Sequence, residues 1–214
     1  MMGRHVSQPP AALIIIAITV VVYFIQTQAF VETMRVFALW PVATPAQMNF
    51  GQDGILRTGF QVWQLITYGG LHGGWAHLFF NMFALYMFGL PIERAWGTRR
   101  FVIYYLVCLV GAGLVQLSVA ALAGEIYPTI GASGAVFGLL LAFGMMYPNT
   151  RIMLLIPPVP IRAKWFVIGY GALTLVFGLT GTMPGIAHFA HLGGMVFGFG
   201  LIMLWGRQDS QRRN

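Results

Sequence analysis

The sequence predicts an all-α membrane protein: a bundle of six transmembrane helices with a large external loop between the first two. First, 58% of its 214 residues are hydrophobic and only 8% are charged, and the mean hydropathy is +0.76, a composition typical of integral membrane proteins. Second, several apolar runs reach the roughly 20 residues that a helix needs to cross a bilayer. Third, basic residues gather in alternate connections between these runs.

The expected helices form one domain over residues 1–214. In chain order they are predicted at about 11–31, 75–92, 101–123, 130–147, 163–181 and 186–205. The first run follows Arg4, as a secretory signal would, but it is long and lacks an A-x-A-type cleavage site, which favours a retained helix. Residues 32–74 carry Trp40 and Trp63 among apolar residues, so this external loop is expected to lie on the membrane surface.

The basic residues predict the orientation. Only Arg35 and Arg57 fall on one side of the expected bundle. The other ten lie on the opposite side: Arg4, Arg94, Arg99, Arg100, Arg151, Arg162, Lys164, Arg207, Arg212 and Arg213. Because cytoplasmic loops carry the excess of Lys and Arg, both termini are expected in the cytoplasm. The net charge of +7 therefore reports topology, and no basic cluster with interleaved aromatics indicates nucleic-acid binding. Without an organelle-targeting segment, the expected location is a bacterial cell (inner) membrane.

Polar residues recur near the outer, N-terminal ends of the second, fourth and sixth expected helices. They are His77 and Asn81, then Ser133, then His188 and His191. Three of these residues lie 14 residues before the expected inner ends of their helices: His77 before Pro91, Ser133 before Tyr147 and His191 before Trp205. At about 1.5 Å per residue, each lies roughly 21 Å above the inner boundary. Polar groups at one membrane depth indicate a functional site, although they can also simply hydrogen-bond helices together.

Small residues predict that two of these helices pack closely. Gly134, Gly138 and Ala142 form a stripe at steps of four on the fourth helix. His191 shares a face with Gly194 and Gly198 on the sixth. Since small residues let helix backbones approach in lipid, His191 is expected to reach Ser133.

The predicted chemistry is nucleophilic catalysis by a serine–histidine dyad. A serine needs a base to take its proton, and His191 is the candidate. No Asp or Glu lies at this level to orient the imidazole, so Phe137, one turn after Ser133, either stacks on His191 or serves plain packing. Backbone N–H groups at the start of the fourth helix, with His77 and Asn81, are candidate donors to an oxyanion. The lone Cys108 is expected to be a small buried residue.

Three stretches, "HGGWAHLFFN" (72–81), "GASGAVFG" (131–138) and "AHLGG" (190–194), resemble the rhomboid family of intramembrane serine proteases over essentially the whole chain. The resemblance implies that Ser133 is the nucleophile and His191 the general base. It makes His77, Asn81 and the Ser133 backbone N–H the oxyanion donors.

The same resemblance implies supporting roles and a substrate class. Gly131 belongs to the turn before the nucleophile, and His72 to the start of the second helix. No cofactor or metal is implied. The partners would be the bilayer and transmembrane helices of other membrane proteins, cut near their outer ends. The fifth helix and residues 180–187, with Met183, would form a lateral gate and cap.

Two departures and two alternatives accompany the resemblance. The first loop has Trp63-Gln64 where the family often has Trp-Arg, and the segment after the second helix reads Glu93-Arg94-Ala95 in place of Glu-x-Arg. One alternative is a non-catalytic rhomboid-like protein that binds membrane helices. The other is a metal site formed by His72, His77, His188 and His191, which leaves Ser133 unexplained. His188 is otherwise expected to support the site by hydrogen bonding or by contacting water, and not to be the base, because only His191 fits the A-H-x-G-G pattern. The sequence leaves the physiological substrate and the oligomeric state open.

Overall fold

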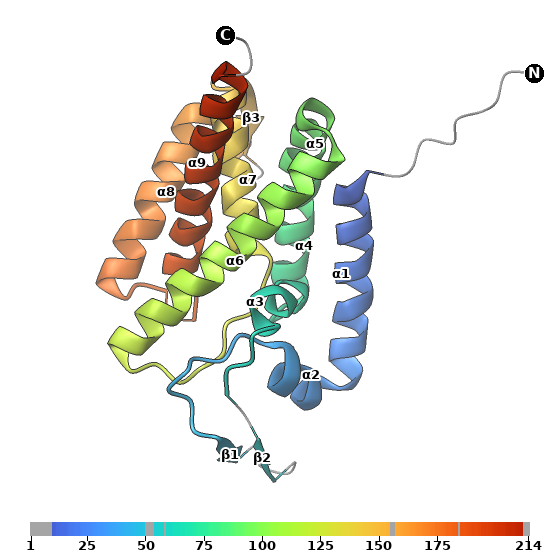
Figure 1. Ribbon diagram of the computed structural model, residues 1–214, viewed down its shortest axis with the longest axis vertical. Coiled ribbons are helices and arrows are strands. Elements are labelled where there is room, and N and C mark those ends of the chain that lie inside the picture. The colour runs from blue at the N-terminus through green and yellow to red at the C-terminus, as the bar shows by residue number, and fades with distance from the viewer. Residues whose placement is uncertain (1–9, 50–53, 58, 155–156, 184, 212–214) are drawn as a thin grey trace, which may run out of the picture.

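The computed structural model is a bundle of helices with two small hairpins (Figure 1). It describes residues 10–49, 54–57, 59–154, 157–183 and 185–211, so the basic residues Arg4, Arg212 and Arg213 lie outside the described residues. The helices are α1 (Ala11–Gln28), α2 (Phe30–Phe37), α3 (Gln64–Thr67), η2 (Tyr68–Gly70), α4 (Trp75–Ala84), η3 (Leu85–Gly89), α5 (Leu90–Trp96), α6 (Thr98–Ala123), α7 (Ser133–Met146), α8 (Ala163–Thr180) and α9 (His188–Gln211).

The predicted fold class, an all-α membrane protein, is confirmed. Among the described residues, five helical segments are long and apolar enough to cross a membrane: Ala11–Gln28, Trp75–Trp96, Thr98–Ala123, Ala163–Thr180 and His188–Gln208. The apolar helix α7 has 14 residues and is shorter than a full span. Residues 130–132, expected in this helix, precede it as a loop, so the helix begins at Ser133 itself.

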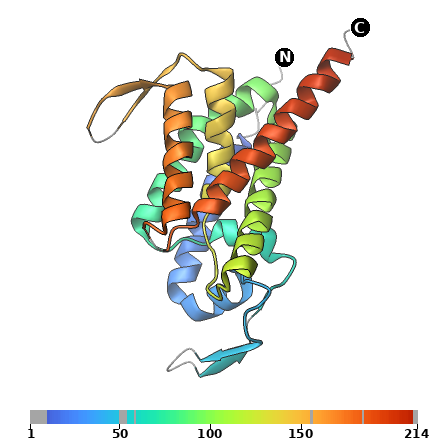
Figure 2. The same cartoon turned by 90° about the vertical axis from the view of Figure 1, so that its left-hand side faces the viewer.

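The long helices alternate in direction along the bundle (Figures 1 and 2). Consequently α4, α7 and α9 begin at the end of the bundle that also carries α2 and the hairpin of β1 (Gln47–Asn49) and β2 (Ile55–Arg57). The second antiparallel hairpin, of β3 (Arg151–Met153) and β4 (Pro160–Arg162), lies at the opposite end. The N-terminal ends of three helices, where the sequence places its polar residues, therefore face the same side.

Three helices end away from where the sequence predicts; the last of them, α9, runs to Gln211, past the expected end at Trp205. The first breaks at Ala29, and α2 follows as a separate helix that carries the exposed Glu32–Arg35 ion pair. The second runs past Pro91 to Trp96, so Pro91 does not mark its inner end. A π-helical turn, η3, precedes this proline. The hydrogen-bond pattern of the helix changes in such a turn, so the helix continues although proline has no N–H to donate.

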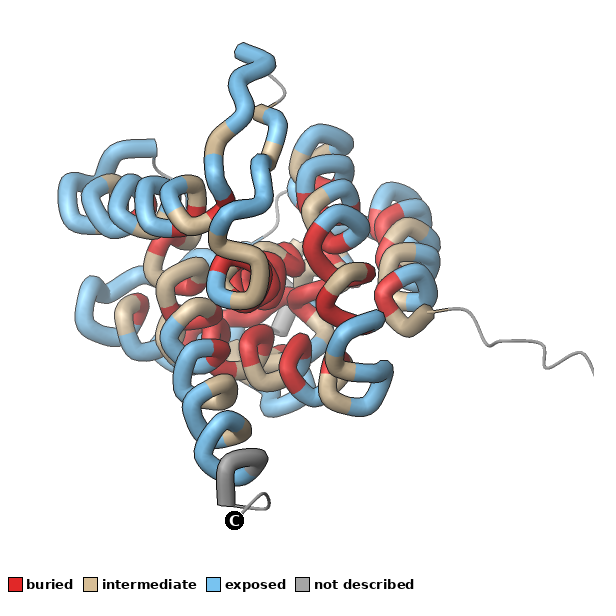
Figure 3. The backbone as a smooth tube through the Cα atoms, turned by 90° about the horizontal axis from the view of Figure 1, so that it is seen from above, coloured by how far each residue is buried: buried red, intermediate tan, exposed pale blue. Residues whose placement is uncertain are grey.

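Buried residues gather at the centre of the view along the bundle (Figure 3). The buried hydrophobic cluster draws most of its residues from α6, α7 and the segment from α4 to α5, and α9 approaches α6 and α7 closely. Glycines allow this approach: an added Cβ would overlap Ala112 at Gly134, the Cys108 sulfur at Gly138 and the Gly134 carbonyl oxygen at Gly194. The Tyr104 hydroxyl donates to the Gly138 carbonyl at 2.8 Å, which further ties α6 to α7. Cys108 is fully buried here, as expected of a small core residue.

Glu93 fixes the start of α1. Its carboxylate accepts hydrogen bonds from the Ala11 and Ala12 backbone N–H groups, at 2.7 and 2.9 Å, and from the Thr98 hydroxyl at 2.7 Å. A carboxylate at a helix N-terminus satisfies unpaired N–H groups and complements the helix dipole. The Glu93-Arg94-Ala95 departure thus leaves this glutamate with helix-terminal partners instead of an arginine.

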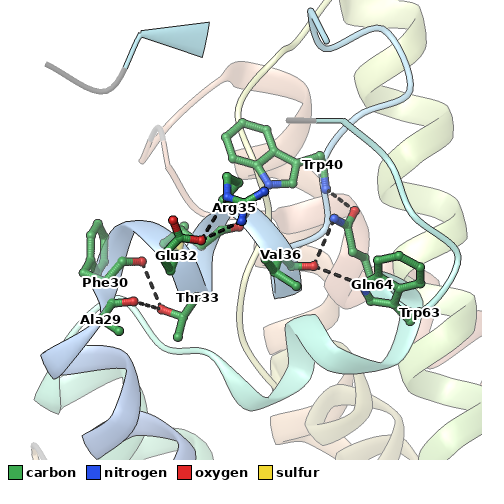
Figure 4. A network of polar contacts seen from close by, with 10 residues as sticks. Ala29, Phe30, Glu32, Thr33, Arg35, Val36, Trp40, Trp63 and Gln64 are labelled. Atoms are coloured by element: carbon green, nitrogen blue, oxygen red, sulfur yellow. Dashed lines mark hydrogen bonds and ion pairs between the residues drawn. The ribbon is translucent and has the colours of Figure 1, made fainter. Parts of the chain in front are cut away.

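Gln64 organises the first loop (Figure 4). Its fully buried side chain accepts from the Trp40 and Gln61 backbone N–H groups and donates to the Val36 and Gly59 carbonyls. The neighbouring Trp63 indole N–H also donates to the Val36 carbonyl, at 3.0 Å. The glutamine of Trp63-Gln64 therefore anchors this loop without a charged residue.

Candidate active site

Ser133 and His191 meet at the end of the bundle where α7 and α9 begin. Ser133 is the first residue of α7, and His191 lies in the first turn of α9. The His191 Nε2 and the Ser133 Oγ are 2.8 Å apart, within hydrogen-bond distance. The imidazole can therefore accept the serine proton directly when it carries its own proton on Nδ1.

An aromatic ring holds the imidazole of His191. Phe137, one turn after Ser133, stacks on it with ring centroids 4.2 Å apart and planes inclined by 10°. Because Phe137 is only 5% exposed, its own position is restrained by packing. A flat aromatic contact here restrains the ring, as an orienting carboxylate does in a catalytic triad.

Glycine at two positions makes the serine–histidine contact possible. Gly131 has φ +118°, and a Cβ there would lie 2.8 Å from ring atoms of His77. Its N–H donates to the Tyr68 carbonyl at 2.9 Å, which positions the turn before Ser133. Gly194 lies one turn after His191 and brings α9 against the backbone of α7. The absence of larger side chains around Ser133 thus serves both the turn and the helix contact.

His77 presents a hydrogen-bond donor to the site. Its Nδ1 accepts the Gly73 N–H at 3.2 Å, so the neutral ring carries its proton on Nε2. That Nε2 lies against Gly131, on the side of the ring facing the turn before Ser133. Asn81, one turn later and 6% exposed, donates from its amide to the His77 carbonyl at 2.9 Å. Its Oδ1 has no partner among the described residues.

Backbone donors lie at the start of α7. The first backbone hydrogen bond of this helix runs from the Val136 N–H to the Ala132 carbonyl at 3.1 Å. The preceding N–H groups, those of Ser133, Gly134 and Ala135, belong to the first turn, where a helix has no internal acceptors. They lie beside the serine hydroxyl and carry the positive end of the helix dipole.

His72 and Gln26 hydrogen-bond to each other next to His77, and the glutamine is not among the predicted site residues. The His72 N–H donates to the Gln26 side-chain oxygen, and the Gln26 amide donates to the His72 carbonyl, both at 3.0 Å. The imidazole of His72 lies edge-to-face against His77 at 4.9 Å. Burial, reinforced by nearby His77, lowers the pKa of His72 to about 4, so this ring is neutral at physiological pH. A glutamine within an otherwise apolar span was the available signal for Gln26.

His188 lies next to the dyad but makes other contacts. Its Nε2 is 3.1 Å from the Thr182 carbonyl, and its ring packs edge-to-face on Phe177. The rings of His188 and His191 are nearly perpendicular, with centroids 6.3 Å apart. Across the described part of the chain, no three His, Cys, Asp or Glu side chains group as metal ligands. The geometry thus pairs His191 with the serine and His188 with the loop that precedes α9.

The fold and this site define a class: a multi-pass helical membrane protein whose bundle holds a hydrogen-bonded serine–histidine pair beside several N–H donors. A family model described as the Rhomboid domain matches residues 59–208. The chain therefore belongs to the rhomboid family, as its motifs predicted.

Relatives support this assignment. RHOMBOID-like protein 4 of Arabidopsis thaliana is 34% identical over 157 residues, which cover 68% of this chain and 35% of that protein. Rhomboid protease GluP of Bacillus subtilis is 34% identical over 161 residues, which cover 73% of this chain and 29% of that protein. The mitochondrial Rhomboid protein 1 of Saccharomyces cerevisiae is 31% identical over 170 residues, which cover 77% of this chain and 48% of that protein. The chain thus spans less than half the length of each of these relatives.

Proposed function

We propose that this protein is an intramembrane serine endopeptidase that cuts transmembrane segments of other membrane proteins near their outer ends. The observation that carries the proposal is the 2.8 Å contact between His191 Nε2 and Ser133 Oγ at the N-terminus of α7. Membership of a family with a relative named as a protease supports it. A protein that only bound membrane helices could use this contact to hold α7 and α9 together, so the cleavage assay below distinguishes the two functions.

In the first step, Ser133 Oγ attacks the carbonyl carbon of the scissile peptide, and its proton passes to His191 Nε2. The developing oxyanion accepts hydrogen bonds from the Ser133 N–H and from the His77 Nε2–H, with the Asn81 amide as a further donor. The Phe137 ring keeps the imidazole plane aligned during this transfer.

In the second step, His191 returns the proton to the leaving amine, and the C–N bond breaks to leave an acyl group on Ser133. A water molecule then gives a proton to His191 and attacks the acyl carbon. The bond from this carbon to Ser133 Oγ breaks, His191 gives its proton to Oγ, and the new carboxyl end is released. Because the mechanism needs neutral His191, activity is expected to fall as this residue becomes protonated at acid pH.

The proposed lateral gate consists of α8 and residues 180–187, of which Pro184 lies outside the described residues. Only Ala163, Val167 and Thr174 of α8 are buried, so little packing opposes its displacement. The bond from His188 to Thr182 restrains the loop beside the dyad, and Met183 in this loop is 52% exposed. We assign His188 this restraining role rather than a catalytic one.

The orientation also belongs to the proposal. Most of the described basic residues lie in α5, at the start of α6, around the β3–β4 hairpin or near the end of α9, away from the dyad: Arg94, Arg99, Arg100, Arg151, Arg162, Lys164 and Arg207. The other two, Arg35 in α2 and Arg57 in β2, lie at the end of the bundle that carries the dyad. The end with most of the basic residues is assigned to the cytoplasm, with both termini, and the dyad to the outer side of a bacterial inner membrane. Reporter fusions after residues 97 and 150 should then read cytoplasmic, and a fusion near 126 external.

The test is cleavage of a reporter transmembrane substrate by purified protein in liposomes. Ser133→Ala and His191→Ala should abolish cleavage. The matched controls Ser118→Ala, at a serine that bonds its own helix, and His188→Ala should keep a large part of the activity. Chelators should have no effect. Cleavage that survives Ser133→Ala and is lost with chelator would overturn the proposal in favour of a metal site, and absence of cleavage of any transmembrane substrate by wild type would favour a non-catalytic binding protein.

A further inference from the structure

A line of aromatic rings runs from α8 across α7 to the base on α9. Phe166 and Tyr170, one turn apart on α8, stack with centroids 5.7 Å apart and planes inclined by 22°. Tyr170 stacks on Phe137 at 4.9 Å and 25°, and Phe137 stacks on His191 at 4.2 Å and 10°. All three contacts are near-parallel. These four rings are called the aromatic stack below.

The orientation of Phe137 depends on Tyr170 as well as on His191. The Phe137 ring is held between a residue of α8 and a residue of α9, and stacked aromatic pairs interact beyond the area that they bury. Removing the Tyr170 ring frees space beside Phe137, so that this ring can tilt away from His191. Tyr170 does not contact the serine, and its influence therefore passes through Phe137.

Helix α8 is the least packed of the three helices in this arrangement. It lies at the side of the bundle, next to α7 and α9 (Figures 1 and 2), and most of its residues are exposed. Tyr170 itself is 42% exposed, against 5% for Phe137. A displacement of α8 therefore alters the Tyr170–Phe137 contact before it disturbs the packed helices.

We infer that Tyr170 is a positioning residue that couples the place of α8 to the orientation of His191. With α8 against the bundle, the aromatic stack holds the imidazole plane in line with Ser133. Outward displacement of α8 removes the Tyr170 contact that restrains the Phe137 ring, so the His191 ring is also less restrained. The His191 ring realigns when α8 closes on a bound segment. The inference rests on the proposed function and adds to it a link between substrate access and proton transfer.

The test is the rate at which a small fluorophosphonate modifies Ser133, since this probe needs the base but not a transmembrane substrate. Tyr170→Leu and Tyr170→Ala should lower the rate about two- to tenfold, the range of an aromatic pair interaction. Tyr170→Phe keeps the ring and should react like wild type. Ile168→Ala, at a residue of α8 that is 59% exposed, is the matched control and should have no effect.

Two further measurements separate positioning from general destabilisation. In a Phe137→Leu background, Tyr170→Leu should cause no further loss, because the link to His191 is already broken. The pH dependence of labelling should change in Tyr170→Leu and not in Ile168→Ala, whereas a folding defect would lower the reactive fraction equally at every pH.

Labelling of Tyr170→Leu at the wild-type rate, or strictly additive losses with Phe137→Leu, would overturn the inference. Cleavage that falls while labelling stays at the wild-type rate would also overturn it, since Tyr170 would then act on substrate access alone. If wild type itself is not labelled at Ser133, the proposed function fails and not only this coupling.

Discussion

Substitution of Gly194 tests whether the close contact of α7 and α9 aligns the dyad. A Cβ at this position would overlap the carbonyl oxygen of Gly134, and a backbone atom cannot move aside as a flexible side chain can. Restoring an ordinary contact requires α9 to shift from α7 by about 1.5 Å, given optimal separations of roughly 3.5 Å. His191 lies one turn before Gly194, so the 2.8 Å distance to Ser133 would exceed the hydrogen-bond limit.

The expected losses follow from this shift. Overpacking of a core costs about 1–3 kcal/mol of folding free energy. A misplacement of about 1 Å in a catalytic group costs on the order of 100-fold in rate. Gly194→Ala should therefore lower cleavage by about two orders of magnitude, and Gly194→Leu should abolish it, with Ser133 and His191 intact. Cleavage of a reporter substrate and thermal unfolding in the same detergent measure the two effects.

Gly200→Ala is the matched control on the same helix. A Cβ at Gly200 meets nothing within 4 Å, so this variant should cleave normally and unfold at or slightly above the wild-type temperature. Cleavage by Gly194→Ala at the wild-type rate would show that the alignment of the dyad does not depend on the α7–α9 contact. Equal losses of cleavage in Gly194→Ala and Gly200→Ala would also contradict this dependence, because any added methyl group on α9 would then have the same effect.

The remaining predictions concern stability. Glu93→Ala should lower the melting temperature more than Glu93→Gln, because the amide oxygen can still accept one of the hydrogen bonds at the start of α1; equal values for the two would contradict the capping role. Gln64→Ala should lower the free energy of unfolding by about 1–3 kcal/mol, because it leaves buried backbone groups unpaired. Thermal unfolding measures this loss, and Gln61→Ala, at an exposed side chain, should lower the free energy of unfolding little. A larger loss in Gln61→Ala than in Gln64→Ala would exclude Gln64 as the anchor of the loop. Because the pKa of His72 is lowered from 6.5 to about 4 in the folded protein, its contribution to stability is complete above pH 6.5 and is lost as the pH falls toward 4. Over that window, the melting temperature should fall further for wild type than for His72→Gln, and identical pH profiles would contradict this assignment.

Much of the site geometry could be predicted because helical spacing and small residues act locally. The steps from Ser133 to Phe137 and from His191 to Gly194 place each pair on one helix face, whatever the tertiary structure. Glycines at 134, 138 and 194 indicate close helix contact on their own. The contact between Ser133 and His191 occurs in the structure. The stacking of Phe137 on His191 occurs too, although the sequence alone did not distinguish it from plain packing.

Other features depend on residues far apart in the chain. Gln26 binds the backbone of His72 across 46 residues, and Glu93 binds the start of α1 across 81 and 82 residues. Nothing in the local sequence specifies such partners. Tyr170 lies in an apolar helix, so the sequence alone suggests a lipid-facing aromatic residue. Only the structure shows that it stacks on Phe137. Pro91 was misleading because a π-helical turn lets the helix continue past it, and its surrounding sequence does not signal that turn.

The most direct test of serine catalysis is to locate a fluorophosphonate adduct by peptide mass spectrometry. One adduct is expected, on Ser133, in wild-type protein reconstituted in liposomes. No adduct is expected on residue 133 in Ser133→Ala, and the yield should be strongly reduced in His191→Ala, because the hydroxyl then keeps its proton. His188→Ala should be modified nearly as wild type is. An adduct on another residue, or His191→Ala modified at the wild-type rate, would contradict the assignment of Ser133 as the nucleophile and His191 as its base.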